Sequence, residues 1–202
     1  MNKNLQDIPD NKISEFAIQF SNHLNCSQKP EKPFVLYFIG MIGSGKSTTA
    51  KFLSRHYNLI RISTDEIRDF LEQNGFSRER SFDIAEIVAE NFLQQGFGVC
   101  FDACFVDQYF QDHVVELSNK FKMQPILLQM QTPESIILKR LQSDNSDRAY
   151  KGDIAIQDYM SRKAKFENLT AQPVVIVDGS GNFDIEMKRV IDIIDKKLKM
   201  ID

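Results

Sequence analysis

Residues 40–48 are the most informative stretch of the chain, and they read Gly-Met-Ile-Gly-Ser-Gly-Lys-Ser-Thr. They fit the pattern GxxxxGK[ST], in which glycines let the backbone turn tightly and point its N–H groups at phosphate oxygens. Lys46 would reach the outer phosphates of a nucleoside triphosphate, and the Ser47 hydroxyl would hold Mg²⁺. An ordinary glycine-rich turn would leave both residues unexplained. The predicted nucleotide-binding residues of this loop are Gly40, Gly43, Ser44, Gly45, Lys46, Ser47 and Thr48.

Two further side chains could serve transfer of a phosphoryl group to an acceptor. Asp65 and Arg68 stand three residues apart and share one face of a predicted helix. The carboxylate could accept the proton of an attacking hydroxyl, and the arginine could bind an anionic acceptor. The alternative is that Asp65 caps the helix and Arg68 is a solvated charge. Next to a phosphate loop we favour the functional interpretation.

A second acid, Asp102, ends an apolar strand 56 residues after Lys46. Nucleoside-triphosphate enzymes place an acid there to orient Mg²⁺ or a bound water, so we predict Asp102 and Ser47 as the metal-binding pair. The alternative is that Asp102 is a turn residue at the end of the strand. Asp178 ends a later strand and precedes two glycines. We predict that these glycines form a turn beside the nucleotide base and that Asp178 has no catalytic role.

A lid is predicted at about residues 142–153, a polar stretch between two helices. A mobile flap with an arginine can close over a triphosphate and stabilise charge on the transferring group. Arg148 is the candidate for this role, and a plain loop arginine is the alternative. Lys139 and Arg140 end the preceding helix, where basic residues also complement the helix dipole.

Strand and helix patterns alternate from residue 34 onward, which predicts right-handed crossovers and a parallel sheet. Apolar runs predict strands at 34–39, 59–63, 98–102, 125–130 and 173–178. Helical spacing predicts helices at 11–25, 46–57, 65–74, 81–95, 110–121, 133–141, 154–168 and 187–198, with Thr132 as the N-cap of the sixth. Ligands of such sheets bind at the carboxyl edge of the strands. The expected fold is an α/β/α sandwich with a five-stranded parallel sheet and an N-terminal helical extension.

The chain has 202 residues, which suits one domain at 34–202 preceded by an extension at 1–33. The apolar stripe of the helix in this extension should cover the outside of the domain. The net charge of −3 does not indicate a nucleic-acid partner, and no apolar run reaches the ~20 residues of a membrane span. Three cysteines without a CxxC pair, and an N-terminus unlike a signal peptide, predict a cytoplasmic protein.

The chain resembles the P-loop kinase family that includes polynucleotide 5′-hydroxyl kinases. Four features carry the resemblance: the phosphate loop, the DxxR motif of Asp65–Arg68, Asp102 at a strand end, and Thr132-Pro-Glu at the start of the helix before the lid. The resemblance spans about residues 34–198 and implies a nucleoside-kinase-like P-loop fold. It implies that Asp65 is the general base and that Arg68 binds an acceptor phosphate. It also implies that a lid arginine contacts the donor phosphates, the position that Arg140 matches. Members often carry a second arginine four residues later, but Asp144 stands there, so this role passes to Arg148.

We therefore expect an ATP-dependent, Mg²⁺-requiring kinase that transfers the γ-phosphoryl group to a hydroxyl. Lys46, Asp65 and Arg148 are its predicted catalytic residues. Related branches of the family phosphorylate gluconate, shikimate, antibiotics or nucleotide sugars, so the acceptor stays open between a small molecule and a nucleic-acid 5′-hydroxyl. Two alternatives are an ATPase that acts on a protein partner and a nucleotide-binding module without turnover.

Overall fold

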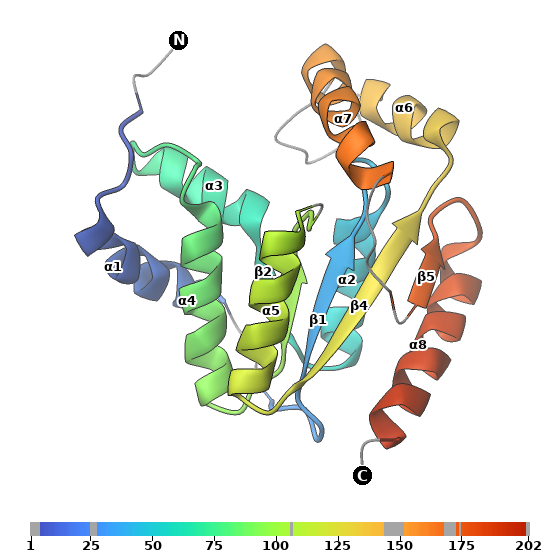
Figure 1. Ribbon diagram of the computed structural model, residues 1–202, viewed down its shortest axis with the longest axis horizontal. Coiled ribbons are helices and arrows are strands. Elements are labelled where there is room, and N and C mark those ends of the chain that lie inside the picture. The colour runs from blue at the N-terminus through green and yellow to red at the C-terminus, as the bar shows by residue number, and fades with distance from the viewer. Residues whose placement is uncertain are drawn as a thin grey trace.

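The computed structural model describes residues 5–24, 28–105, 107–143, 152–167, 173 and 175–200. From β1 onward, each strand is followed by one or two helices (Figure 1). The helices are α1 (Asp10–Ser21), α2 (Lys46–His56), α3 (Thr64–Gln73), α4 (Ser81–Gln94), α5 (Gln108–Lys120), α6 (Glu134–Gln142), α7 (Gly152–Glu167) and α8 (Phe183–Lys199). The strands are β1 (Phe34–Ile39), β2 (Ile60–Ser63), β3 (Val99–Asp102), β4 (Gln124–Gln131) and β5 (Val175–Asp178).

The five strands form one parallel sheet in the order β2-β3-β1-β4-β5. All six residues of β1 are buried, because helices cover both faces of this central strand. The register pairs Ser63 of β2 with Asp102 of β3, so these two strands end level with each other. The loops that leave β1, β2 and β3 therefore meet at one edge of the sheet.

Two apolar clusters fill the space between the sheet and its helices. One face packs against α2 and α8, through residues such as Leu53 and Val190. The other face packs against α4 and α5, through residues such as Val88 and Val114. The three-layer α/β/α sandwich with an all-parallel five-stranded sheet is the predicted fold (Figure 1).

A third cluster joins the phosphate loop to the helix pair α6 and α7. Met41, in the loop, is buried together with Ile137 and Leu141 of α6 and Ala155 and Tyr159 of α7. The two helices stand above the carboxyl edge of the sheet (Figure 1). Apolar contact thus holds the helices on either side of the predicted lid directly against the loop.

The N-terminal helix α1 packs on α4. Phe16 and Phe20 are buried and belong to the same apolar cluster as the central sheet. The predicted covering role of this stripe is thereby confirmed, and it is directed at α3 and α4, since Phe16 and Phe20 both make edge-to-face contacts with Phe70. In the described part of the chain no helix has the length and apolarity to span a membrane.

Element ends agree with the predicted ranges within four residues, and the largest differences are the end of α1 and the start of α8. One predicted detail is wrong: Thr132 is not the N-cap of α6, because Pro133 holds that position. The Thr132 hydroxyl instead donates a hydrogen bond of 2.9 Å to the carbonyl oxygen of Ser44. Tertiary packing against the phosphate loop has overridden the local capping preference.

Candidate functional site

The phosphate loop leaves β1 at Gly40 and enters α2 at Lys46. Two of its glycines have left-handed backbone angles, with φ of 81° at Gly43 and 105° at Gly45. Other residue types rarely adopt such angles, so the glycines are needed to form this turn. The loop curls around the start of α2, whose N-terminal N–H groups and dipole favour an anion.

Lys46 lies over this loop. Its ammonium donates to the carbonyl oxygens of Gly40 at 2.8 Å and Met41 at 2.9 Å. An ammonium group has three donors, so these two bonds hold the side chain in place and leave one donor for a ligand. Ser44 is 1% exposed, and among the residues that the structure describes its hydroxyl is the buried side-chain polar group that lacks a hydrogen-bond partner. These donors fit a polyphosphate.

Ser47 and Asp102, the predicted metal-binding pair, are in contact. The Ser47 hydroxyl donates to Asp102 Oδ1 at 2.9 Å. Asp102 is the last residue of β3 and is 4% exposed. Because Ser47 gives its hydrogen to the carboxylate, its oxygen keeps its lone pairs for a cation. One hydroxyl and one carboxylate beside a phosphate site are the ligand types that Mg²⁺ takes in phosphoryl-transfer enzymes.

The second oxygen of Asp102 is bound by an arginine that the sequence patterns did not single out. Arg61, in β2, donates from Nη1 to Asp102 Oδ2 at 2.6 Å. Its Nη2 pairs with Glu66 in the first turn of α3. Burial raises the pKa of the Asp102 carboxyl, and Arg61, Ser47 and Lys46 act against that rise. Desolvation lowers the pKa of Arg61, but Asp102 and Glu66 outweigh it, so the pKa of this arginine is raised.

Asp65 and Arg68 lie at the start of α3, as predicted, and form an ion pair with an Nη1–Oδ1 distance of 2.8 Å. Arg68 also donates from Nε to the hydroxyl of Ser81, at the start of α4, at 3.2 Å. The cap of α3 is Ser63, whose hydroxyl accepts from the N–H of Glu66. The capping alternative for Asp65 is therefore wrong. Its carboxylate is largely exposed, with 66% of the side chain accessible.

Arg140 of α6 lies against the phosphate loop. Its guanidinium donates to the carbonyl oxygens of Gly43 at 3.2 Å and of Gly179 at 2.7 Å. It therefore links the loop to the turn after β5. Arg148 and the middle of the predicted lid lie outside the described residues.

A further arginine, Arg162, comes from α7. It donates from Nε to Asp158 at 2.7 Å. Desolvation lowers the pKa of Arg162, but Asp158, Cys104 and Asp65 outweigh it, and the pKa is raised. The Cys104 thiol in turn donates to the carbonyl oxygen of Gly40 at 3.1 Å. The Arg162 guanidinium therefore lies within electrostatic range of both Asp65 and Cys104.

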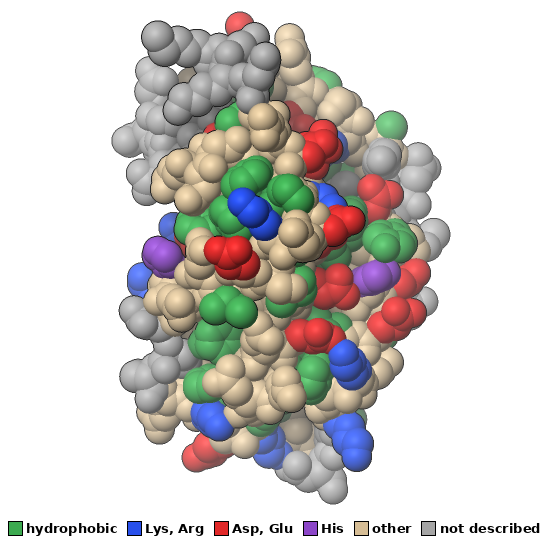
Figure 2. All heavy atoms as spheres, turned by 90° about the vertical axis from the view of Figure 1, so that its left-hand side faces the viewer, with side chains coloured by type: hydrophobic (Ala, Val, Ile, Leu, Met, Phe, Trp, Pro, Cys, Tyr) green, Lys and Arg blue, Asp and Glu red, His purple; other side chains and the backbone are tan. Residues whose placement is uncertain are grey.

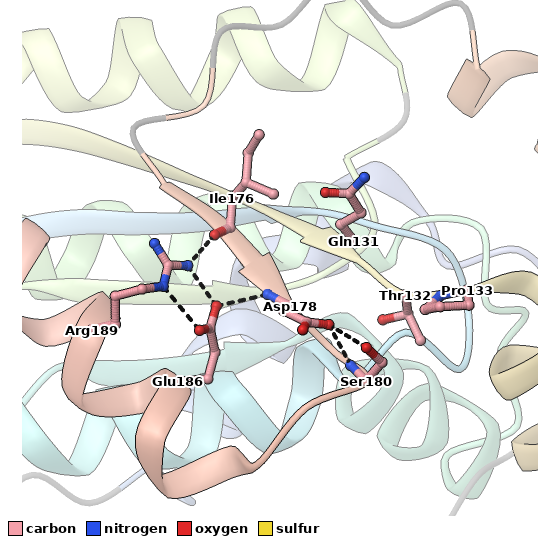
Figure 3. Close-up of a pocket in the computed structure, with 8 residues that line it drawn as sticks. All are labelled: Gln131, Thr132, Pro133, Ile176, Asp178, Ser180, Glu186 and Arg189. Carbon is pink, nitrogen blue, oxygen red and sulfur yellow. Dashed lines mark hydrogen bonds and ion pairs between the residues drawn. The ribbon is translucent and has the colours of Figure 1, made fainter.

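A pocket of about 600 Å³ lies beside the edge of the sheet at β5. Figure 3 shows that the charged side chains in its lining are held by neighbouring groups of the protein. Arg189 pairs with Glu186 and donates to the carbonyl oxygen of Ile176, while Glu186 accepts from the N–H of Asp178. The Asp178 carboxylate accepts from the backbone and hydroxyl of Ser180, as a turn residue does. This pocket lies along the edge strand β5, and neither Lys46 nor Asp65 is among the described residues that line it.

Sequence patterns missed Arg61, Arg162 and the role of Thr132. The signal for Arg61 was visible, since a charged residue stands between Ile60 and Ile62 in a short apolar strand. A charge in such a strand is uncommon unless it has a buried partner. Arg162 had no comparable signal, because a polar residue in an amphipathic helix is ordinary.

Solved structures with the same arrangement include kinases. The APS kinase of Mycobacterium tuberculosis, in complex with AMPPNP and APS, is 18% identical, with a TM-score of 0.59 over 82% of this chain and 99% of that chain. A sugar kinase from Janibacter sp. is 15% identical, with a TM-score of 0.59 over 81% and 95%. Shikimate kinase from Aquifex aeolicus is 16% identical, with a TM-score of 0.51 over 81% and 98%. These likenesses show the P-loop kinase fold.

No curated protein matches the sequence at a significant level. A family model described as an AAA domain matches residues 35–169, which is more than half of the chain and includes the phosphate loop, Asp65, Asp102 and Arg140. The chain therefore belongs to this AAA domain family and has the fold of the P-loop kinases.

Proposed function

We propose that this protein is an ATP-dependent kinase that transfers the γ-phosphoryl group of ATP to a hydroxyl of a small-molecule acceptor. The observation that carries the proposal is the placement of two unlike groups at one sheet edge. Lys46 and the phosphate loop offer donors to a triphosphate at the start of α2. Asp65 offers an exposed carboxylate in the first turn of α3, which follows β2 at the same edge.

In this reaction the acceptor oxygen attacks the γ-phosphorus and forms a new P–O bond. The bond from this phosphorus to the β–γ bridging oxygen breaks, and ADP leaves. Asp65 takes the proton of the hydroxyl and aligns it. Lys46 and the loop amides stabilise negative charge on the phosphate oxygens. Bound Mg²⁺, held by Ser47 with Asp102 behind it, would neutralise further charge on the same oxygens. Arg140 and Arg148 are the proposed donor-phosphate arginines.

The charge of the acceptor side favours a small molecule over a nucleic acid. Residues 61–120 contain 12 acidic and 5 basic residues, a net charge of −7 against −3 for the whole chain. Figure 2 looks onto the side of α1, α3 and α4, where acidic side chains are spread over the surface. Arg68, Arg78 and Arg80 are each paired with carboxylates. A nucleic-acid strand requires cations that are available to its phosphates.

The test is transfer of label from γ-labelled ATP to a panel of sugars, sugar acids, nucleosides, amino alcohols and 5′-hydroxyl oligonucleotides. We expect a labelled product from a small-molecule class and none from the oligonucleotides. Hydrolysis that is independent of every acceptor would instead support an ATPase. A labelled oligonucleotide would overturn the choice of a small acceptor.

Two pairs of variants test the assigned roles. Lys46→Ala should abolish turnover, whereas Lys51→Ala, exposed one turn further along α2, should not. Asp65→Asn should bind ATP normally and lose transfer by a factor of roughly 10²–10⁴, the usual contribution of a general base. Asp69→Asn, on the same helix and paired with Arg78, is its matched control. Transfer at the wild-type rate in Asp65→Asn would refute the base assignment.

A further inference from the structure

A chain of hydrogen-bonded side chains connects the phosphate loop to the helix that carries the proposed base. It runs from Ser47 to Asp102, then to Arg61, and ends at Glu66. Each member comes from a different element, in the order α2, β3, β2 and α3. Glu66 directly follows Asp65 in the first turn of α3, so the chain joins the nucleotide side of the site to its acceptor side.

The sheet register explains why Arg61 can make this connection. Arg61 stands opposite Cys100 on the neighbouring strand, so Asp102, two residues further along, is its diagonal neighbour on the same face. Cys100 belongs to the apolar cluster on the α2 side of the sheet, and Ser47 lies in the first turn of α2. The Arg61 side chain is 16% exposed and that of Asp102 is 3% exposed, so solvent competes little for their contact.

Building on the proposed function, we propose that Arg61 is a positioning residue for the magnesium nucleotide. Its guanidinium fixes Asp102 Oδ2, and this leaves Oδ1 directed at the Ser47 hydroxyl. Ser47 then gives its hydrogen to Asp102, and its oxygen lone pairs stay available to the cation. The other arm of the guanidinium holds Glu66, and thus the start of α3, in register with the loop. A planar fork with two fixed arms can serve both partners, whereas a lysine ammonium lacks this geometry.

The test compares ATP affinity with Mg²⁺ and with excess EDTA by calorimetry, for the wild type, Arg61→Met and Arg61→Lys. The magnesium gain is the ratio of the two dissociation constants. We expect Arg61→Met to lower this gain at least tenfold, while its affinity for ATP in EDTA stays within about twofold of the wild type. Arg61→Lys keeps the positive charge and should recover thermal stability but not the magnesium gain. This variant keeps the test decisive if Arg61→Met folds poorly.

Arg78→Met is the matched control, because Arg78 is also a partly buried, ion-paired arginine, held by Asp69 and Glu72 of α3. It should lose stability and keep the magnesium gain. A wild-type gain in Arg61→Met or in Arg61→Lys would overturn the inference, as would an equal loss of affinity with Mg²⁺ and with EDTA. If the wild type bound no ATP under either condition, the proposed function itself would fail, and this inference with it.

Discussion

The turn after β5 is packed so tightly against the phosphate loop that one added methyl group should disturb both. A Cβ atom built on Gly179 would lie 1.9 Å from Thr132 Oγ1 and 2.6 Å from the carbonyl oxygen of Ser44. The second neighbour is backbone of the phosphate loop, so it cannot move aside by a change of rotamer. The substitution Gly179→Ala therefore requires the turn and the loop to separate.

The expected cost can be worked from these contacts. Overpacking of a tight site costs about 1–3 kcal/mol. Loss of the hydrogen bond from Thr132 to the Ser44 carbonyl adds about 0.5–1.5 kcal/mol. The sum, about 1.5–4.5 kcal/mol, corresponds to a fall in melting temperature of about 3–18 °C for a domain of this size. Affinity for ATP should fall as well, because the displaced carbonyl belongs to the loop.

Thermal unfolding followed by circular dichroism measures the first effect, and calorimetric titration with ATP the second. Gly181→Ala is the control, since a Cβ there meets only atoms of the Asp178 side chain, at 3.2 Å or more, and no backbone atom of the phosphate loop. Adding Thr132→Ala to Gly179→Ala should restore part of the stability, because it removes the 1.9 Å contact and leaves the 2.6 Å one. If Gly179→Ala melted within about 1 °C of the wild type, the turn would not press on the loop as described.

Three further outcomes are expected. Phe16→Ala should lower the free energy of unfolding by about 3–5 kcal/mol in a denaturant titration, because this ring is 7% exposed within the main core, and a cost below about 1 kcal/mol would contradict that packing. The pKa of Glu186 is lowered mainly by its hydrogen bond with Arg189. The negative charge of Glu186 therefore stabilises the fold fully above the unfolded-state pKa of 4.5, and this stabilisation is lost as the pH falls through the lower pKa of the folded state. The melting temperature of Glu186→Gln should therefore be below that of the wild type at pH 7 and close to it near pH 3, and a gap that widened on acidification would refute this sign. Burial raises the pKa of the Cys100 thiol, so a thiol reagent should modify Cys104 in the folded protein and Cys100 only after denaturation. Peptide mapping measures both modifications, and modification of Cys100 in the folded protein would contradict its burial.

The sequence by itself determined the elements, the fold class and the location of the phosphate loop. The spacing of apolar residues indicates which face of each helix or strand is buried. The glycines that precede Lys46 and Ser47 allow the loop conformation that binds phosphate, so this motif alone predicts the local backbone structure. The sequence also predicts that Ser47 and Asp102 lie at one edge of the sheet and that Asp65 and Arg68 share a helix face, and in the structure each pair is in contact. These predictions succeeded because each depends on local chain geometry or on the rule that parallel strands end at one edge.

Tertiary structure alone decided which charges face each other across elements. Arg61 reaches Asp102 because β2 and β3 pair in one register, and a shift by one residue would turn its side chain to the other face. The Thr132 hydroxyl binds the Ser44 carbonyl oxygen, 88 residues away along the chain, in place of the helix N-terminus that the sequence predicts as its partner. Such contacts join residues that are far apart in sequence, so no local pattern records them, and only the packed sheet and its register bring them together.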